Sequence, residues 1–424
     1  MVTRRVTYRI YPSSQQEKRL HWARRLHCYL YNAAIANRRT QYQKFGHSVD
    51  YFEQQNCLPA FKEVWTDYKE LGSHALQATL KRVDFAYQRF FKKLGKYPKF
   101  KAYRHYSGWT YPCKQSWKVS TNNGVNGHLE LRDLGISLQM RGKARQWGKA
   151  KTCTIFYRNG KWYASITVEC APVRETGKDS VGLDFGCKTA VATSKGEFIE
   201  NPKFLANSQE KIRQLSKGLR RKRKPQKRKV KASRRWKKTQ AKISKERRKV
   251  ANRRQDWVHQ TATHIVSRYS MVATEKLNLK GMTKKAKKGS TRKRQKTGLN
   301  RSILDVGIGM LRDAIKYKVI EAGGLFVEVP TQKVKPTQRC AECWELTPKT
   351  LSDRVHKCQH CGHEDDRDIN AARVCEIWAR GQELASLDAE SPSSTSKART
   401  CTGSMKQLGA KKRRKLLAQR SSEE

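Results

Sequence analysis

The sequence predicts a multidomain α/β protein, in which a β-rich N-terminal region carries a helical insert and a later α/β region carries a metal-binding insert. Three observations support this prediction. The chain has 424 residues, more than one hydrophobic core usually serves, so about two to four domains are expected. Its hydrophobic period changes along the chain between about two and about 3.6 residues. Two C-x-x-C pairs in the last third of the chain predict a separate metal module.

The charge of the chain predicts a polyanionic partner. Ninety-two Lys and Arg residues stand against 36 Asp and Glu residues, which gives a formal net charge of +56 and a sequence pI near 10.3. Self-repulsion of this size would strain a compact fold unless a polyanion neutralised it, and phosphate backbones are the usual polyanion. A membrane is excluded as partner because no apolar run approaches the roughly 20 residues that span a bilayer. We therefore predict a nucleic-acid-binding protein without a small-molecule substrate.

The start of the chain and its cysteines favour a reducing compartment. Residues 1–5 lead straight into an alternating strand pattern, so a signal peptide is not expected. Of the 12 cysteines, four form the two C-x-x-C pairs and the others are scattered, whereas a secreted chain would spread them as a disulfide framework. We expect a cytoplasmic protein of the prokaryotic cytosol or nucleoid.

The N-terminal elements begin with a strand. Apolar and polar side chains mostly alternate over residues 3–11, as in a half-buried strand. Pro12 ends the strand, and Ser13 can cap a following helix. From Gln15 to about Leu94 apolar residues recur mostly at three- and four-residue steps, which predicts a block of helices with a basic outer face.

Short strands joined by turns are expected after this block, over residues 100–172. The pair Asn159-Gly160 is a clear hairpin signal among them. We expect these strands to pair with the first strand in a small barrel or curved sheet. Residues 1–14 and 100–175 would then form one β domain, with 15–99 as its helical insert.

The chain after the β domain alternates between strand and helix. Residues 181–186 and 190–193 predict a hairpin, and residues 271–275 and 325–329 predict later strands. Helical stretches lie between them, including residues 303–322. This alternation is typical of an α/β domain.

Two basic segments stand apart from these patterns. Residues 211–254 contain 23 Lys or Arg residues and a single acid, Glu246, and predict a long solvated helix pair broken near Pro225. Residues 283–301 form a second basic run that we interpret as a flexible loop. The Ser-, Thr- and Lys-rich residues 381–424 lack a core pattern and predict a disordered basic tail. We expect nucleic-acid contacts on both sides of the break in the helix pair: Arg221, Lys222, Arg223, Lys224, Arg234, Arg235, Trp236 and Lys237.

Aromatic residues among basic ones are candidates to stack on unpaired bases. They are Trp109, Tyr111, Trp117 and Trp236. Most aromatic side chains belong to a core, however, and only Trp236 has basic neighbours on both sides that favour nucleic acid.

The strongest motif is a cysteine quartet, Cys340, Cys343, Cys358 and Cys361. Each C-x-x-C turn places two thiolates on one side of a tight turn, and two such turns complete a tetrahedron around Zn²⁺. Four thiolates leave no open position, so this zinc would be structural rather than catalytic. His360 could substitute as a ligand.

A second group of candidates consists of carboxylates that follow apolar strands or open a helix. Asp184, Glu275 and Asp368 are the main members, and Asp366 lies beside the last. Each alone has an ordinary explanation as a turn cap, an ion-pair partner or a helix cap. Together they suggest two-metal phosphodiester hydrolysis, in which carboxylates hold two Mg²⁺ ions about 4 Å apart.

The segments around these residues resemble TnpB, the family of transposon-encoded, RNA-guided DNA endonucleases related to type V CRISPR effectors. Residues 181–186, residues 275–280 and a two-turn cysteine segment running into residues 366–372 resemble the three split RuvC motifs and the zinc ribbon of the family. With weaker likenesses upstream, the resemblance covers about residues 1–380.

The resemblance implies domains. They are an RNase H-like (RuvC) nuclease domain over residues 176–334 and 365–380, a zinc-ribbon insert for target nucleic acid over 335–364, and a wedge-like β domain carrying a recognition insert. One departure is Trp344, which follows the second cysteine where the family commonly has glycine, so we expect a distorted turn there.

The resemblance also implies chemistry and partners. Asp184, Glu275 and Asp368 would be the catalytic carboxylates of a Mg²⁺ site, and Asp366 a helix cap or supporting group. The partners would be a guide RNA and a target DNA, which is cut where it pairs with the guide next to a short flanking motif.

Two alternatives stay open. One is an RNA-guided DNA-binding protein or transposition regulator with little nuclease activity, which the presence of all three carboxylates disfavours. The other is a DNA-strand-transfer transposase, which shares the metal chemistry and would differ in its product, joined rather than hydrolysed ends. The cysteine insert between the second and third carboxylates favours the endonuclease.

Overall fold

The computed structural model describes residues 2–172, 174–225, 231–286, 289, 291–350 and 353–390, the last nine by their backbone alone. The chain divides into two compact units. The first comprises Met1–Gly177, Ala262–Arg268 and Ile315–Gly324, and the second comprises Lys178–Thr261, Tyr269–Ala314 and Leu325–Glu424. This division gives two short segments to the first unit that we had placed in the nuclease domain. None of the helices in the described ranges is long and apolar enough to cross a membrane.

Seven antiparallel strands form the sheet of the first unit, in the order β2-β6-β7-β1-β5-β4-β3. Their bounds are β1 (Val2–Tyr11), β2 (Gly108–Tyr111), β3 (Trp117–Asn122), β4 (Val125–Leu131), β5 (Ile136–Lys143), β6 (Lys149–Arg158) and β7 (Lys161–Cys170). The first strand pairs with both β5 and β7, as predicted. Only residues 112–116 join the edge strands β2 and β3, so the sheet must curl to bring its two edges near each other.

The hairpin between β6 and β7 confirms the turn prediction. Asn159 and Gly160 both have positive φ, 54° and 75°, as a two-residue type I′ turn requires. Three aromatic side chains of the sheet lie in its core: Trp109, Tyr111 and Trp117 are each 1% exposed. These three candidates therefore cannot stack on nucleic-acid bases, in agreement with the expectation that most aromatic side chains belong to a core.

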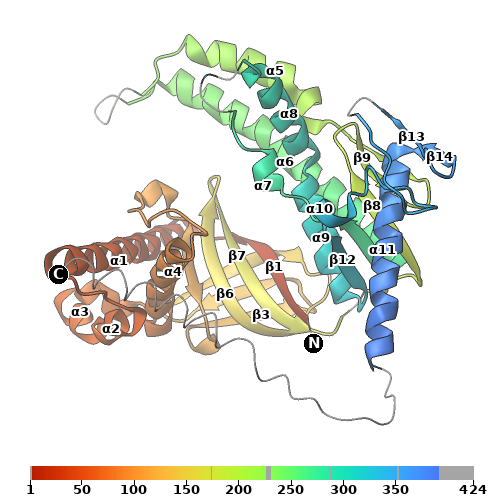
Figure 1. Ribbon diagram of the computed structural model, residues 1–424. Coiled ribbons are helices and arrows are strands. Elements are labelled where there is room, and N and C mark those ends of the chain that lie inside the picture. The colour runs from red at the N-terminus through yellow and green to blue at the C-terminus, as the bar shows by residue number, and fades with distance from the viewer. Residues whose placement is uncertain are drawn as a thin grey trace, which may run out of the picture. The chain divides into compact units, whose positions relative to one another are not determined.

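The predicted helical block contains four α-helices of the first unit. They are α1 (Ser14–Phe45), α2 (Tyr51–Asn56), α3 (Leu58–Val64) and α4 (Ser73–Phe91). The Ser13 hydroxyl accepts from the backbone N–H of Gln16, whose side chain accepts from Ser13 in return, so a capping box starts α1. Figure 1 shows these helices beside the curled sheet, and one hydrophobic core joins both.

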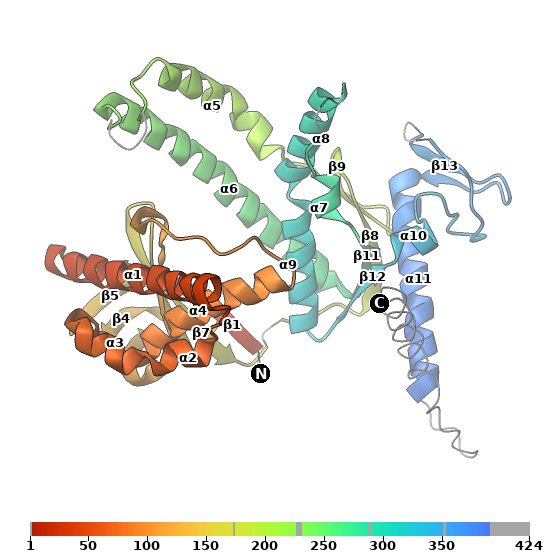
Figure 2. The same ribbon diagram turned by 60° about the vertical axis from the view of Figure 1, so that its left-hand side comes forward.

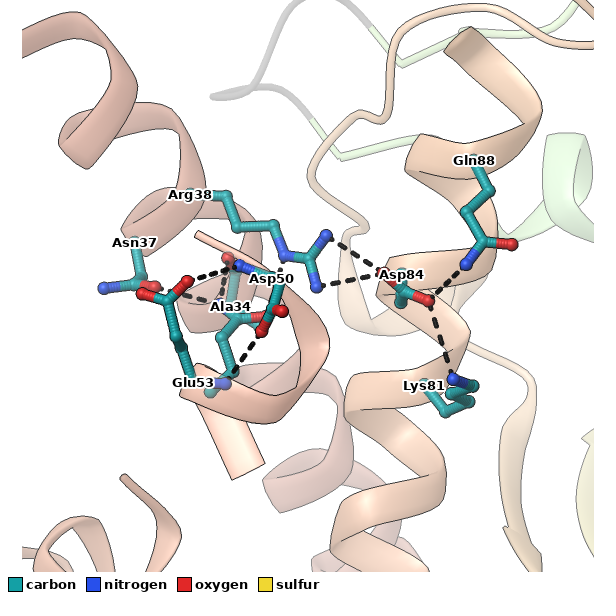
Figure 3. Close-up of polar contacts among 9 residues, drawn as sticks. Ala34, Asn37, Arg38, Asp50, Glu53, Lys81, Asp84 and Gln88 are labelled. Carbon is teal, nitrogen blue, oxygen red and sulfur yellow. Dashed lines mark hydrogen bonds and ion pairs between the residues drawn. The ribbon is translucent and has the colours of Figure 1, made fainter. Parts of the chain in front are cut away.

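A buried polar network holds three of these helices in register (Figure 3). Arg38 on α1 donates to Gln54 Oε1 on α2 at 2.9 Å and to Asp84 Oδ1 on α4 at 3.3 Å. Gln88 donates to Asp84 Oδ2 at 2.7 Å. Both oxygens of the buried carboxylate are thus hydrogen-bonded, as a buried charge requires.

The second unit contains a mixed five-stranded sheet in the order β10-β9-β8-β11-β12. The strands are β8 (Asp179–Phe185), β9 (Thr189–Thr193), β10 (Phe198–Glu200), β11 (Tyr269–Glu275) and β12 (Leu325–Val329). The pair β8 and β9 is the predicted antiparallel hairpin, whereas β8, β11 and β12 run parallel. Helix α11 (Arg367–Glu390) packs on β8 so closely that a Cβ on Gly182 would lie 1.7 Å from the carbonyl oxygen of Ala372. Only glycine permits this approach.

The remaining helices of the chain confirm one prediction and correct another. The basic helix pair is present as α5 (Phe204–Arg220) and α6 (Arg234–Arg268). Three further helices, α7 (Leu279–Met282), α8 (Lys293–Val306) and α9 (Ile308–Glu321), precede β12, and α10 (Thr331–Val334) follows it. The helix expected over 303–322 is broken at Gly307, whose φ of 75° lies outside the helical region.

Two segments are more helical than predicted. In the expected loop over residues 283–301, α8 begins at Lys293, because Lys, Arg and Gln are good helix formers and Ile303 and Val306 bury one face of the helix. In the expected disordered tail, α11 continues to Glu390 and ends two residues before Pro392, whose predecessor is disfavoured in a helix. Residues 391–424 lie outside the described residues.

Candidate functional site

Two carboxylates lie on adjacent parallel strands of the second unit. Asp184 lies near the end of β8, and Glu275 ends β11. The register pairs Leu183 with Thr274, so the next residue on each strand, Asp184 and Glu275, lies beside the other. Neighbouring residues of parallel strands project from the same face, and ligand sites of such sheets lie at the carboxyl ends of the strands.

The third carboxylate, Asp368, belongs to the first turn of α11. This helix starts where it does because Asp366 Oδ1 accepts from the backbone N–H groups of Asp368 at 2.8 Å and Ile369 at 3.3 Å. The predicted role of Asp366 as a helix cap is therefore confirmed. Ala372 lies one helical turn after Asp368 and contacts Gly182 of β8. This contact holds the start of α11 near the ends of the strands.

Both other carboxylates act electrostatically on Asp184. Burial and the charges of Glu275 and Asp368 raise the pKa of Asp184 to about 7. Burial also raises the pKa of Glu275, which is 9% exposed. Glu275 Oε1 is buried and has no hydrogen-bond partner among the described residues.

This donor set fits a divalent cation. Mg²⁺ takes oxygen ligands, and a buried carboxylate oxygen without a partner is an available one. Among the described residues, the four cysteines are the one group of at least three metal-ligating side chains whose ligand atoms all lie within 4.8 Å of one another.

Besides the three predicted carboxylates, the second unit buries a further acid, Glu376 on α11, which was not identified from the sequence. Its carboxylate is buried and accepts from Ser180 Oγ at 2.5 Å and from Ser194 Oγ, and it pairs with Lys195 at 3.2 Å and Arg380 at 2.6 Å. Burial alone would raise its pKa, but these hydrogen bonds and the charge of Lys195 outweigh burial and lower the pKa. Glu376 thus fastens α11 to the sheet. The sequence did contain one signal for Glu376: it follows Asp368 by eight residues, about two helical turns, and so lies near the same face of the helix.

The predicted cysteine quartet converges. The sulfurs of Cys340, Cys343, Cys358 and Cys361 all lie within 4.8 Å of one another, and the pairs across the two turns are 3.7 Å and 3.5 Å apart. Backbone N–H groups of Cys361 and His360 lower the pKa of Cys358, which favours the thiolate that binds metal. Four sulfurs complete the set without the ring of His360.

Each C-x-x-C turn is followed by a residue in the left-handed region. Trp344 has a φ of 65° and Gly362 has a φ of 72°. The turn before Trp344 is therefore not distorted, and the expectation of distortion is wrong. The tryptophan accepts a backbone conformation that suits glycine, while its ring packs on the core around Ala341 and contacts the guanidinium of Arg339 at 5.2 Å.

One buried side chain joins this four-cysteine segment (residues 335–364) to α11. Asn370 is 0% exposed; its Oδ1 accepts from Ala341 N at 3.0 Å, and its Nδ2 donates to Arg339 O at 2.7 Å. The two backbone groups flank Cys340. The hairpin of β13 (Val355–Lys357) and β14 (Glu364–Asp366) then runs directly into α11. The cysteine turn and Asp368 are therefore held on one short piece of structure.

The predicted nucleic-acid residues gather at one end of the α5–α6 pair. Figures 1 and 2 show the two helices side by side, and Lys211 on α5 pairs with Glu246 on α6 at 3.6 Å. Ser233 N donates to Arg223 O at 3.2 Å, and Ser233 Oγ accepts from Trp236 N at 3.1 Å. These bonds bring residues 221–224 close to residues 234–237. Most of these side chains are exposed, whereas Trp236 is partly buried.

Two family models match parts of the chain. The model OrfB_IS605, described as a probable transposase, matches residues 163–286, which include Asp184 and Glu275. The model described as the Cas12f1-like TNB domain matches residues 309–375, which include the four cysteines and Asp368.

Similar proteins extend over nearly the whole chain. InsQ of Escherichia coli (strain K12), named as an RNA-guided DNA endonuclease, is 30% identical over 378 residues, 86% of this chain and 90% of the relative. A Streptomyces pristinaespiralis protein named in the same way is 27% identical over 388 residues, 88% of each chain. A cryo-EM structure of a Cas12f1–sgRNA–target DNA complex shares the fold, with a TM-score of 0.58 at 12% identity over 88% of this chain and 98% of that one. The chain belongs to the TnpB family.

Proposed function

We propose that this protein is an RNA-guided DNA endonuclease of a transposon, with a guide RNA and a target DNA as its partners. The similarity to InsQ supports this function, because it covers 90% of that relative. The net charge of +56 supports it as well. A protein that holds an RNA–DNA heteroduplex by its phosphates needs many cations, while base pairing reads the sequence.

We further propose that the nuclease domain is RuvC-like (RNase H-like) and that Asp184, Glu275 and Asp368 hold Mg²⁺ in a two-metal site. The observation that carries this proposal is the placement of Asp184 beside Glu275 on adjacent parallel strands, with Asp368 close enough to raise the Asp184 pKa. When bound, the ions would activate water and stabilise the leaving oxygen. The chain contributes an open oxygen on Glu275 and a helix start that sets the position of Asp368.

The four cysteines would hold a structural Zn²⁺, since four converging thiolates leave no position for substrate. Through Asn370 this zinc would brace the helix that carries Asp368. The basic end of the α5–α6 pair would bind nucleic-acid phosphates, with Trp236 able to stack on a base. Binding of nucleic acid should then weaken steeply with salt.

The test uses the full chain purified with its own RNA, which is sequenced to define a matching DNA target. We expect Asp184→Ala, Glu275→Ala and Asp368→Ala each to lower the cleavage rate by at least about 1000-fold, because each removes a metal ligand. RNA and DNA binding should stay within about threefold, because the basic surfaces remain. Asp313→Ala, an exposed acid on α9, is the control and should cut like the wild type. Wild-type cleavage by Asp184→Ala would refute the site.

The match to a model described as a probable transposase keeps one second candidate, strand transfer, open to the same assay. Hydrolysis leaves free DNA ends, whereas strand transfer leaves covalently joined strands. Sequencing of the product ends distinguishes them. A wild-type protein that binds RNA and target but cuts nothing in Mg²⁺ would instead be a binding protein or transposition regulator.

A further inference from the structure

One guanidinium lies between the carboxylate site and the four-cysteine segment. Arg367 is the first residue of α11, and its Nε and Nη2 each lie 3.1 Å from Asp368 Oδ1. Its Nη1 donates to the carbonyl oxygen of Asp353, in the four-cysteine segment, at 2.8 Å. The side chain is 13% exposed. Both sides of the planar fork are therefore engaged, one by a carboxylate of the site and the other by backbone.

The backbone of Arg367 strengthens this attachment. Its N–H donates to the carbonyl oxygen of Arg354 at 2.9 Å, next to the carbonyl that the side chain contacts. The position of the guanidinium is thus set from the four-cysteine segment. A fork held in this way restricts the orientation of the carboxylate that it grips.

The charge of Arg367 also acts on Asp184. Burial and the charges of Glu275 and Asp368 raise the pKa of Asp184, and the positive charge of Arg367 lowers it. The other arginine near the start of α11 is occupied elsewhere: Arg373 pairs with Asp365 at 2.9 Å and donates to the carbonyl oxygen of Ser194 at 3.3 Å. Arg367 is therefore a cation that contacts Asp368 and also acts on Asp184.

We propose that Arg367 is a positioning residue that preassembles the carboxylate site before divalent ions bind. It offsets the mutual repulsion of Asp184, Glu275 and Asp368 and orients Asp368 from its anchor on the four-cysteine segment. This inference rests on the proposed metal site. Two consequences follow from the two parts of the role. Its charge stabilises the metal-free site and competes with the ions, whereas its fork sets the geometry that the bound ions need.

The experiment compares wild type, Arg367→Gln, Arg367→Lys and the control Arg373→Gln, each as the full chain with its RNA. The proteins are exchanged into Mg²⁺-free buffer without a chelator, so that zinc stays in place. Mn²⁺ binding is followed by electron paramagnetic resonance, thermal unfolding with and without Mn²⁺, and cleavage at saturating metal with kcat and KM for DNA determined separately.

We expect Arg367→Gln to bind Mn²⁺ about tenfold more tightly than Arg373→Gln, because a positive charge beside the site is gone. Without metal, the unfolding temperature of Arg367→Gln should be lower than that of Arg373→Gln by about 3 °C or more. Saturating Mn²⁺ should remove this difference. Its kcat should fall about tenfold or more with KM unchanged, since Asp368 loses its orientation. Arg367→Lys keeps the charge but not the fork, so Mn²⁺ affinity should stay near wild type while kcat falls.

Equal Mn²⁺ affinity and equal metal-free stability in Arg367→Gln and Arg373→Gln would overturn the inference. A loss of stability that Mn²⁺ does not reduce would overturn it as well, because it would mark Arg367 as an attachment of the four-cysteine segment alone. The proposed function fails separately: in that case the wild type itself binds no more Mn²⁺ than Asp184→Ala.

Discussion

The helices of the first unit and the sheet of the second unit both bury carboxylates, but they satisfy them differently. Asp84 receives Arg38 and Gln88 on its two oxygens, with Lys81 3.8 Å away (Figure 3). Glu275 keeps a buried oxygen that has no partner in the described part of the chain, and the pKa of Asp184 is raised to about 7. A carboxylate with all its partners fixes helices together, whereas one that lacks them is a place for a cation.

Glu376 shows that buried carboxylates also differ from one another within the second unit. It lies on the same helix as Asp368, two turns further along, and its pKa is lowered because serine hydroxyls and Lys195 outweigh the effect of burial. One helix thus carries both the proposed metal ligand Asp368 and Glu376, whose hydrogen bonds attach the helix to the sheet.

The largest expected effect is on cleavage by Glu275→Gln. The amide keeps the shape of the side chain but removes the charge that a metal ion needs, so the cleavage rate should fall by at least about 1000-fold. Stability without metal should be unchanged or higher, because burial already disfavours the charged form of Glu275. Single-turnover cleavage and urea unfolding measure the two quantities. If Glu275→Gln cleaves at more than a tenth of the wild-type rate, Glu275 is not a metal ligand and does not differ from Asp84 in this way.

Arg38→Met should have the reverse pattern. It leaves Asp84 buried without its ion-pair partner, which should lower the free energy of unfolding by about 3–5 kcal/mol. Lys81→Met is the matched control, because Lys81 is 45% exposed and its pair with Asp84 should contribute at most about 1 kcal/mol. Both variants should cut at the wild-type rate per folded molecule. Equal losses of stability in urea unfolding would show that the network in Figure 3 is not what holds α1 to α4.

The raised pKa of Asp184 predicts a pH dependence. Its folded-state pKa of about 7 lies above the ordinary value of 3.8, so the folded state binds more protons between these pH values. The metal-free protein should therefore lose about 4 kcal/mol of stability from this group as pH rises from about 4 through about 7, and the loss should level off above about pH 8. Asp184→Asn removes this slope, which urea unfolding between pH 5 and 8 detects as a difference from wild type.

Glu376 provides the control for this pH dependence, because its pKa is shifted in the opposite direction. The pKa of Glu376 is lowered, so its contribution is present above its unfolded pKa and is lost as pH falls. Replacing Glu376 by Gln should therefore cost stability near neutral pH and less in acid. A wild-type curve that parallels the Asp184→Asn curve would contradict the assignment of the shift to Asp184.

The smallest expected effect concerns the link between zinc and the site. Asn370→Ala removes two buried hydrogen bonds around Cys340, which should cost about 1–3 kcal/mol and lower cleavage about tenfold. Zinc should be lost to a chromogenic chelator faster than from the control Asn207→Ala, which is exposed on α5. Chelation of zinc from the wild type should also impair cleavage. Normal cleavage by a zinc-free protein would show that the brace is dispensable.

Local patterns sufficed for several parts of this protein. The spacing of Cys340, Cys343, Cys358 and Cys361 predicted their convergence, because each C-x-x-C turn forms from neighbouring residues. The capping box of α1, the turn at Asn159 and Gly160 and the strand periods likewise depend on residues close in sequence. A resemblance of short motifs identified Asp184, Glu275 and Asp368, although it said nothing of their partners.

Tertiary structure decided what depends on residues far apart. Asp184 and Glu275 meet because β8 and β11 pair in parallel across 91 positions (275 − 184), and Asp368 joins them because Gly182 lets α11 approach. The burial of Trp109 depends on the curl of a sheet that no single strand reveals. The contacts of Arg367 and Asn370 with the four-cysteine segment also form only in the folded chain. The sequence by itself determined where carboxylates and thiols stand along the chain. The fold determined which of them meet, and it left one buried oxygen of Glu275 without a partner among the described residues.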